Sequence, residues 1–235
     1  MNFFNRLQGV FFSPQTTFKA LAEKPVWKLT LVFILILTAV FIYLVNPYIQ
    51  QDTLKTFKNN VKLQERLGEE RYNRMLERYE NPTKTSRLLG AFVFTPITMM
   101  IGLLLSSLFL LVIGRLTSTE GKFILVFSAF IHANIIDKLL GNAVRLILIF
   151  TRKSFIQTTT SLALFFPRLE VLSTPYIILS QFDFFQLWMF GILAYGLAAI
   201  FKISLKKALF VSYGFFILKS AFNIALALIQ TTALR

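Results

Sequence analysis

The sequence predicts an all-α fold: an integral membrane bundle of about five transmembrane helices with amphipathic surface helices. Hydrophobic residues make up 55% of the 235 residues and charged residues only 15%, whereas soluble domains average about 45–50% and about 25%. The apolar residues are grouped into blocks long enough to cross a hydrocarbon core about 30 Å thick. The predicted organisation is an amphipathic interfacial segment over residues 1–28 and a five-span membrane domain over residues 29–235. The spans are expected at residues 29–49, 88–114, 123–150, 184–201 and 208–229.

The first 28 residues have the pattern of two short amphipathic helices. Phe3, Leu7 and Val10 recur at helical spacing and form one apolar stripe. Ser13 followed by Pro14 is a typical helix start, with serine as the N-cap and proline in the first turn. We expect these helices to lie in the membrane interface and to orient the first span. Docking on a partner protein is the alternative.

Residues 50–87 are the one long polar segment of the chain, with nine Lys or Arg and six Asp or Glu. Their pattern indicates two helices separated near Gly68, and Glu70 and Arg74 have the spacing of a favourable i,i+4 ion pair. We expect a helical hairpin on the membrane surface. It would act as a solvated cap, with a recognition module as the alternative.

The second span contains two features that affect helix packing. Thr95-Pro96 predicts a kink, because proline lacks a backbone donor and clashes with the preceding turn. Thr98, Gly102 and Ser106 form a stripe of small residues that lets another helix approach closely. Close packing is the simplest interpretation of the stripe, and a hinge is the alternative.

The third span is longer than a membrane requires. Its 28 residues would measure about 42 Å, so it must tilt, bend near Gly141 or protrude from the bilayer. Residues 151–183, which follow, contain two apolar pieces that are too short to cross. Interfacial or re-entrant segments are expected there.

The same span carries charged residues near its middle, where one unpaired charge costs about 2.5–3.5 kcal/mol. On a regular helix its polar residues share one face, and His132 lies opposite. We expect Asp137 to pair with Lys138 or with Lys219, which stands at a matching depth in the fifth span. The predicted intramembrane polar cluster consists of Asn134, Asp137, Lys138, Asn142, Arg145, Lys219 and Asn223. Either it is a structural clasp between spans three and five, or it lines a pocket for an anionic headgroup or small anion.

The sequence gives no reason to expect an enzyme. The absence of cysteine excludes disulfides, thiolate metal sites and cysteine catalysis. His132 has no partner at metal-ligand spacing, so a packed or hydrogen-bonded histidine is expected. The nucleophile and phosphate-loop motifs of common enzymes are missing as well. We therefore expect no catalytic residues, no cofactor and no metal.

The net charge of +14 indicates a class of partner. In a chain this apolar, basic residues beside the spans are attracted to anionic lipid headgroups by about 1 kcal/mol each. We therefore expect membrane lipids rather than nucleic acid as partners, with other membrane proteins as the second class. The sequence does not specify an oligomeric state.

Several short motifs of the chain indicate a known family. Near the N-terminus they are Phe12-Ser13-Pro14 and Glu23-Lys24-Pro25-Val26-Trp27. The stronger ones are Phe182-Asp183-Phe184-Phe185-Gln186-Leu187-Trp188, Ala194-Tyr195-Gly196-Leu197 and Lys202-Ile203-Ser204-Leu205-Lys206-Lys207-Ala208. Together these motifs resemble those of prokaryotic Yip1-domain proteins. The resemblance implies a five-span membrane domain with a cytoplasmic N-terminus, and it carries over no catalytic residues.

We therefore expect a non-enzymatic, Yip1-like integral membrane protein that organises the membrane or assembles with other membrane proteins. The alternative is a small transporter or lipid-handling protein that uses a positively charged intramembrane pocket between spans three and five. The expected location is a prokaryotic cytoplasmic (inner) membrane with the N-terminus in the cytoplasm. The compact turn with Lys202, Lys206 and Lys207 supports that orientation, although the opposite side carries thirteen basic residues against nine.

Overall fold

Helices account for every regular element that the structure describes. The computed structural model covers residues 1–235, and its described residues are all except 59–63, 66–67, 157–159, 172 and 235. Within them, the only extended pairing is an isolated bridge between Ser161 and Asp183. The elements are α1 (Phe3–Phe12), α2 (Pro14–Glu23), α3 (Lys28–Lys58), α5 (Glu69–Glu80), α6 (Lys84–Leu89), the π-helical turn η1 (Gly90–Phe94), α7 (Thr95–Arg115), α8 (Phe123–Ile135), the π-helical turn η2 (Ile136–Gly141), α9 (Asn142–Arg152), the 3-10 turn η3 (Leu162–Phe165), α10 (Thr174–Ser180), α11 (Phe184–Phe201) and α12 (Leu205–Leu234).

Within the described residues, five helical stretches are long and apolar enough to cross a membrane, which confirms the predicted all-α bundle. They are Lys28–Lys58, Lys84–Arg115, Phe123–Arg152, Phe184–Phe201 and Leu205–Thr231. The second consists of α6, η1 and α7, and the third of α8, η2 and α9. The first span is longer than predicted, because α3 continues through Pro47 to Lys58 instead of ending at residue 49.

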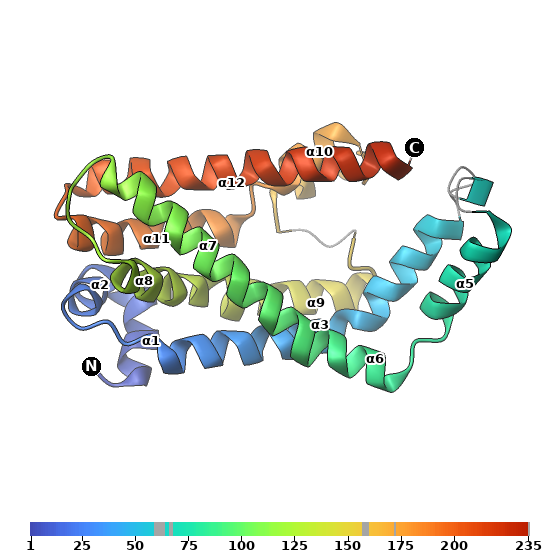
Figure 1. Ribbon diagram of the computed structural model, residues 1–235, viewed down its shortest axis with the longest axis horizontal. Coiled ribbons are helices and arrows are strands. Elements are labelled where there is room, and N and C mark those ends of the chain that lie inside the picture. Colours follow the sequence, from blue (N-terminus) through green and yellow to red (C-terminus); the bar gives the residue numbers. More distant parts are fainter. Residues whose placement is uncertain (59–63, 66–67, 157–159, 172, 235) are drawn as a thin grey trace.

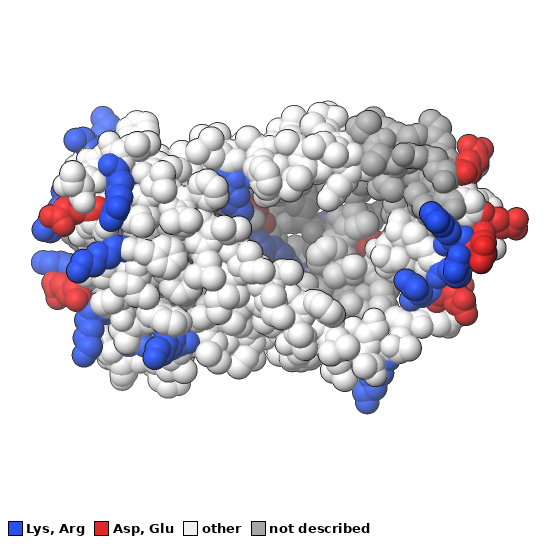
Figure 2. Space-filling view, viewed as in Figure 1, with Lys and Arg blue, Asp and Glu red and all other residues white. Residues whose placement is uncertain are grey.

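The third span occupies the centre of the bundle. In its most apolar window 67% of the residues are buried, against 28% in the first, second and fifth spans. The long helices run side by side along the long axis of the molecule, with α1 and α2 at one end and α5 at the other (Figure 1). Charged side chains gather at these two ends and leave a nearly uncharged belt between them (Figure 2). This distribution fits a bundle that crosses a bilayer along its long axis.

The two N-terminal helices form as predicted, and their apolar stripe packs on the bundle. Val10, Phe18 and Leu21 belong to the main hydrophobic core. Phe18 lies on the surface of α11 where Gly196 has no side chain, since a Cβ built on Gly196 would lie 2.7 Å from the Phe18 ring. The opposite side of these helices remains open, with Phe12 87% exposed.

In the described part of the polar segment after the first span, the end of α3 and the helix α5 (Glu69–Glu80) are helical, while part of the first helix predicted there lies outside the described residues. The continuation of α3 supplies the first half, and Gly68, at φ +75°, precedes α5 as the predicted break. Helix α5 docks on α3 through the Tyr72 hydroxyl, which donates to the Phe57 carbonyl at 3.2 Å. The predicted pair of Glu70 and Arg74 is formed at 3.3 Å.

The second span is irregular at the predicted place. The π-helical turn η1 ends immediately before Thr95-Pro96, and the Thr95 hydroxyl donates to the Gly90 carbonyl at 2.9 Å. The small-residue stripe, in contrast, is exposed at Thr98 and Gly102 and half-buried at Ser106. A Cβ built on Gly102 would meet nothing within 4 Å in the described structure. Close packing by this chain therefore does not explain the stripe.

The fourth span is short and begins part-way along the bundle. Helix α11 has 18 residues and α12 has 30, which correspond to about 27 Å and about 45 Å. The described parts of residues 153–183 fill the remaining length, where α10 packs against α12 (Figure 1). Part of this non-helical backbone is bonded within the protein, because the Leu162 N–H donates to the Phe182 carbonyl at 3.1 Å.

The packing of the N-terminal helices can be tested with two phenylalanine variants. Phe18 is fully buried, so Phe18→Ala should destabilise the protein by about 3–5 kcal/mol through the lost burial and the cavity left behind. Phe12→Ala, on the exposed side of α1, should change the unfolding free energy by less than about 0.5 kcal/mol. Reversible unfolding in SDS measures both. Equal effects of the two variants would show that α2 does not pack on α11.

Candidate functional site

A π-helical turn sets the geometry at the centre of the third span. The turn η2, Ile136–Gly141, interrupts the regular helix at the place where a bend near Gly141 was predicted. On a regular α-helix, Asp137 and Arg145 would lie about 80° apart around the axis. A π-helical turn adds about one residue to the helix, so the two positions are in effect seven residues apart and only about 20° out of line. The turn therefore aligns the two side chains.

Asp137 forms two ion pairs inside the bundle. It is 4% exposed, and one of its carboxylate oxygens, Oδ2, accepts from Lys138 Nζ at 2.7 Å. The other oxygen, Oδ1, accepts from Arg145 Nη2, also at 2.7 Å. A carboxylate with two charged donors is compensated for the loss of water, as a buried charge requires.

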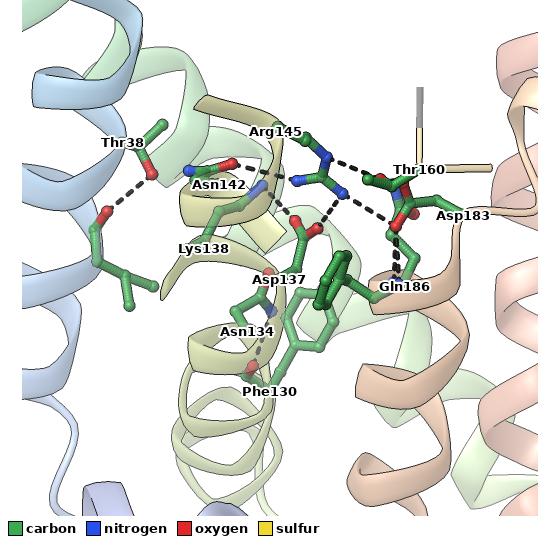
Figure 3. A network of polar contacts seen from close by, with 12 residues as sticks. Thr38, Phe130, Asn134, Asp137, Lys138, Asn142, Arg145, Thr160, Asp183 and Gln186 are labelled. Atoms are coloured by element: carbon green, nitrogen blue, oxygen red, sulfur yellow. Dashed lines mark hydrogen bonds and ion pairs between the residues drawn. The ribbon is translucent and has the colours of Figure 1, made fainter. Parts of the chain in front are cut away.

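Arg145 connects the third span to the start of the fourth. Its Nη2 also donates to Asp183 Oδ1 at 2.9 Å, while Nη1 donates to Asn142 Oδ1 at 3.1 Å and Nε to Thr160 Oγ1 at 3.2 Å. The guanidinium also stands 5.8 Å from the centre of the Phe185 ring. Figure 3 shows this group between the two carboxylates. All three nitrogens of one guanidinium are thus engaged.

Asp183 anchors the beginning of α11. As the N-cap it accepts from the backbone N–H groups of Phe185 at 2.9 Å and Gln186 at 3.2 Å. The Thr160 hydroxyl donates to its second carboxylate oxygen, and the Phe184 backbone N–H donates to the Thr160 carbonyl at 3.1 Å. A negative charge at a helix N-terminus is favourable, so Asp183 serves both the helix and the ion-pair network.

Gly141 provides the space in which these groups meet. A Cβ at this position would lie 3.0 Å from Arg145 Nη1, 3.1 Å from Asp137 Oδ1 and 3.2 Å from the Phe185 Cβ. Any side chain would therefore push apart the third span, the ion pair and α11. A glycine at the end of the π-helical turn permits this close approach.

The polar residues of the fifth span contact the fourth span and the segment that directly precedes it. Lys219 Nζ donates to Gln186 Oε1 at 3.1 Å and stands 5.9 Å from the centre of the Phe190 ring. Asn223 Nδ2 donates to Gln181 Oε1 at 3.2 Å. Among the described ion pairs of Asp137, none involves Lys219. The clasp expected between spans three and five is therefore corrected to one between spans three and four, because Gln186 holds the Lys219 ammonium.

The structure brings four of the seven predicted residues into one network: Asp137, Lys138, Asn142 and Arg145. Asn134 bonds to its own helix, its Nδ2 donating to the Phe130 carbonyl at 2.8 Å. The sequence interpretation missed three members of the surrounding site, Thr160, Asp183 and Gln186. An available signal was the aspartate directly before an apolar run, which is typical of a helix N-cap.

His132 is a hydrogen-bonded core residue, as expected. Its Nδ1 lies 2.8 Å from the Ser128 carbonyl and its Nε2 lies 2.9 Å from the Thr30 hydroxyl. Because a carbonyl can only accept, Nδ1 carries the proton and Nε2 accepts from Thr30. This bond joins the first span to the third.

A third buried carboxylate fixes the chain beyond the third span. Asp52 Oδ2, on α3, accepts from the Ser154 hydroxyl at 2.9 Å and from the backbone N–H groups of Phe155 at 2.7 Å and Ile156 at 3.0 Å. The Tyr176 hydroxyl on α10 donates to the Ile156 carbonyl at 2.9 Å, and burial raises the pKa of this phenol. Asp52 thus holds the segment that leads toward Thr160.

The central site is a network of fixed charges. Two carboxylates, Asp137 and Asp183, stand among three cations, Lys138, Arg145 and Lys219. In the described part of the chain no three metal-ligating side chains gather. The partners of these groups come from the third, fourth and fifth spans and from the segment between spans three and four. The arrangement can therefore hold these helices together, and its excess positive charge can attract an anion.

Comparison with known families decides the classification. The profile of the Yip1 domain matches residues 9–227. The chain belongs to the Yip1 domain family. The Yip1 domain thus covers α2, all five apolar helices and the complete ion-pair network, and the chain is a multi-pass membrane protein. Comparison with curated proteins and with solved structures finds no match.

The division of the network between spans can be tested by two double-mutant cycles. The pair of Asp137→Asn and Arg145→Gln should show a coupling energy of about 1–3 kcal/mol, as expected for residues in direct contact. The pair of Asp137→Asn and Lys219→Gln should show less than half that value, because the two side chains share no bond. Reversible SDS unfolding supplies the free energies. Equal coupling in both cycles would place Lys219 beside Asp137 and contradict the network described above.

Proposed function

We propose that this Yip1-domain protein is a non-enzymatic membrane scaffold that assembles with other membrane proteins and thereby organises the membrane around it. The single observation that carries the proposal is the exposed small-residue face of α7. The buried ion-pair network supports the proposal, because it holds the helices of the bundle in one arrangement and so fixes the position of the exposed face of α7.

The central charges are bonded to structural partners. Asp137 receives two charged donors, and Arg145 donates from all three of its nitrogens. A catalytic group needs a free lone pair or proton directed at a substrate. The arrangement therefore favours a structural role for these residues.

The outer face of α7 is suited to contact with another transmembrane helix. Thr98 and Gly102 are exposed, and nothing described lies within 4 Å of a Cβ built on Gly102. Ile101 and Leu105 beside them are also exposed. Helices associate in lipid through small residues at this spacing, because the backbones can then approach closely. We infer that a helix of another membrane protein packs here.

Replacing Gly102 should disrupt this assembly. A photo-crosslinking residue at position 102 should form an adduct with a membrane protein, and Gly102→Leu should reduce co-purification of the same protein at least tenfold, because leucine prevents close helix approach. Gly214→Leu is the matched control, since Gly214 in α12 also has open space at its Cβ. Mass spectrometry identifies the adduct, and an adduct of two chains would identify the partner as a second copy.

A small transporter or lipid-handling protein is the second candidate. Lys219 stands beside the two cations and two carboxylates of the network and gives the region an excess positive charge, and charged atoms are visible in a hollow of the otherwise uncharged belt (Figure 2). This candidate would replace the first if position 102 gave no adduct and if reconstituted vesicles showed lipid scrambling or anion flux that Lys138→Gln abolished.

We propose a prokaryotic cytoplasmic membrane and a cytoplasmic N-terminus. The turn between α11 and α12 carries Lys202, Lys206 and Lys207, and short loops rich in lysine are retained in the cytoplasm. With five spans, the C-terminus then lies outside. Alkaline phosphatase fused after Arg235 should be active, and green fluorescent protein at the same position should be dark. The reverse pattern would contradict this orientation.

A further inference from the structure

A basic pocket lies at the end of the bundle opposite the N-terminus. It has a volume of about 680 Å³ and lies between α3, α5 and α6. Three arginines from α5 line it, Arg71, Arg74 and Arg78, with Gln50 contributed by α3 and Ser86 by α6. None of these residues belongs to the central ion-pair network.

The charges of α5 are segregated around the helix. At about 100° per residue, the three arginines fall within an arc of about 60°, and the four glutamates of the helix occupy a separate arc of about 100°. Figure 2 shows basic side chains on the bundle side of this end and acidic side chains at its outer edge. A surface helix with randomly distributed charges would have acidic and basic side chains on every side. In α5 the side with the three arginines lines the pocket.

The arginines have few acidic partners within the protein. Arg74 pairs with Glu70 at 3.3 Å in an exposed contact, and exposed pairs of this kind hold their partners weakly. Among the described residues, Arg71 and Arg78 form no ion pair. The anchoring pair of this helix is a different one, Glu80 with Lys58 at 2.6 Å. The guanidinium groups are therefore available to a ligand.

The position of the pocket along the chain indicates the ligand. Gln50 directly follows the first span predicted at residues 29–49, and Ser86 lies two residues before the second span predicted at residues 88–114. The pocket thus lies where the hydrocarbon core ends and lipid phosphates begin. Met75 and Tyr79 add apolar lining on the same helix, suited to the glycerol and upper acyl region of a lipid.

We propose that this pocket binds the phosphate group of an anionic phospholipid headgroup. Guanidinium groups bind phosphate through paired N–H donors, and basic side chains near the membrane surface attract anionic lipid. The lipid would join α5 to the ends of the first two spans. This site is independent of the helix contact proposed at Gly102, so the failure of one proposal leaves the other standing.

Native mass spectrometry of the full chain in neutral detergent, with phosphatidylglycerol as the probe, tests the site. The triple variant R71Q/R74Q/R78Q should bind the lipid about a hundredfold more weakly, because three attractive charges are removed. The matched control K19Q/K206Q/K207Q removes the same charge from exposed positions at the other end and should change binding less than about twofold. R71K/R74K/R78K keeps the charge without the planar donor geometry and should lie between these limits.

Two results would overturn the proposal. Equal weakening by the R71Q/R74Q/R78Q and K19Q/K206Q/K207Q triples would mean that the lipid follows overall charge rather than this pocket. Displacement of the lipid by inorganic phosphate at matching concentration would identify a free anion, not a lipid, as the ligand. All variants alter exposed side chains, and an unchanged elution volume on size exclusion confirms their fold.

Discussion

The bundle depends on one shared guanidinium group. Arg145 stands between Asp137 of the third span and Asp183 at the start of the fourth, and both contacts are shorter than 3 Å. A buried charge without a partner is far more costly than a paired one. Each of these three groups therefore stabilises the positions of the other two, and the central helix cannot rotate or slide past the fourth span without breaking the pair between Arg145 and Asp183.

Local geometry in three places serves this contact. The π-helical turn aligns Asp137 with Arg145, Gly141 leaves room for the pair, and the late start of α11 puts an N-cap at the right depth. The last feature requires non-helical backbone inside the bundle. The structure meets that requirement by bonding Thr160 and Phe184 through their backbones and by fixing the preceding segment on Asp52. The π-helical turn, Gly141 and the late start of α11 thus all contribute to bringing Asp137, Arg145 and Asp183 into contact.

The sequence was sufficient to predict an all-α bundle with the five candidate membrane helices found among the described residues, since hydrophobic blocks of membrane length are a strong signal. It was also sufficient to group Asp137, Lys138, Asn142 and Arg145. It did not predict Asp183 as their partner, because that contact spans 38 positions and depends on where α11 begins. The angular positions of the polar residues were calculated for a regular α-helix, which does not contain the π-helical turn. Lys219 was a candidate partner of Asp137 because both residues stand near the middle of their spans. The exposed position of Gly102 was equally beyond the sequence, because a small-residue stripe does not specify which helix it will meet.

The separation of Arg145 from Asp183 has a consequence for biosynthesis. The middle of the third span emerges from the ribosome with two cations, Lys138 and Arg145, and one carboxylate, Asp137. The second carboxylate of the network, Asp183, follows 38 residues after Arg145. At about 5–20 residues per second, this delay lasts about 2–8 s. During that interval the nascent helix carries an uncompensated positive charge that disfavours release into lipid. We therefore expect departure of this helix from the insertion machinery to be coupled to synthesis of the fourth span.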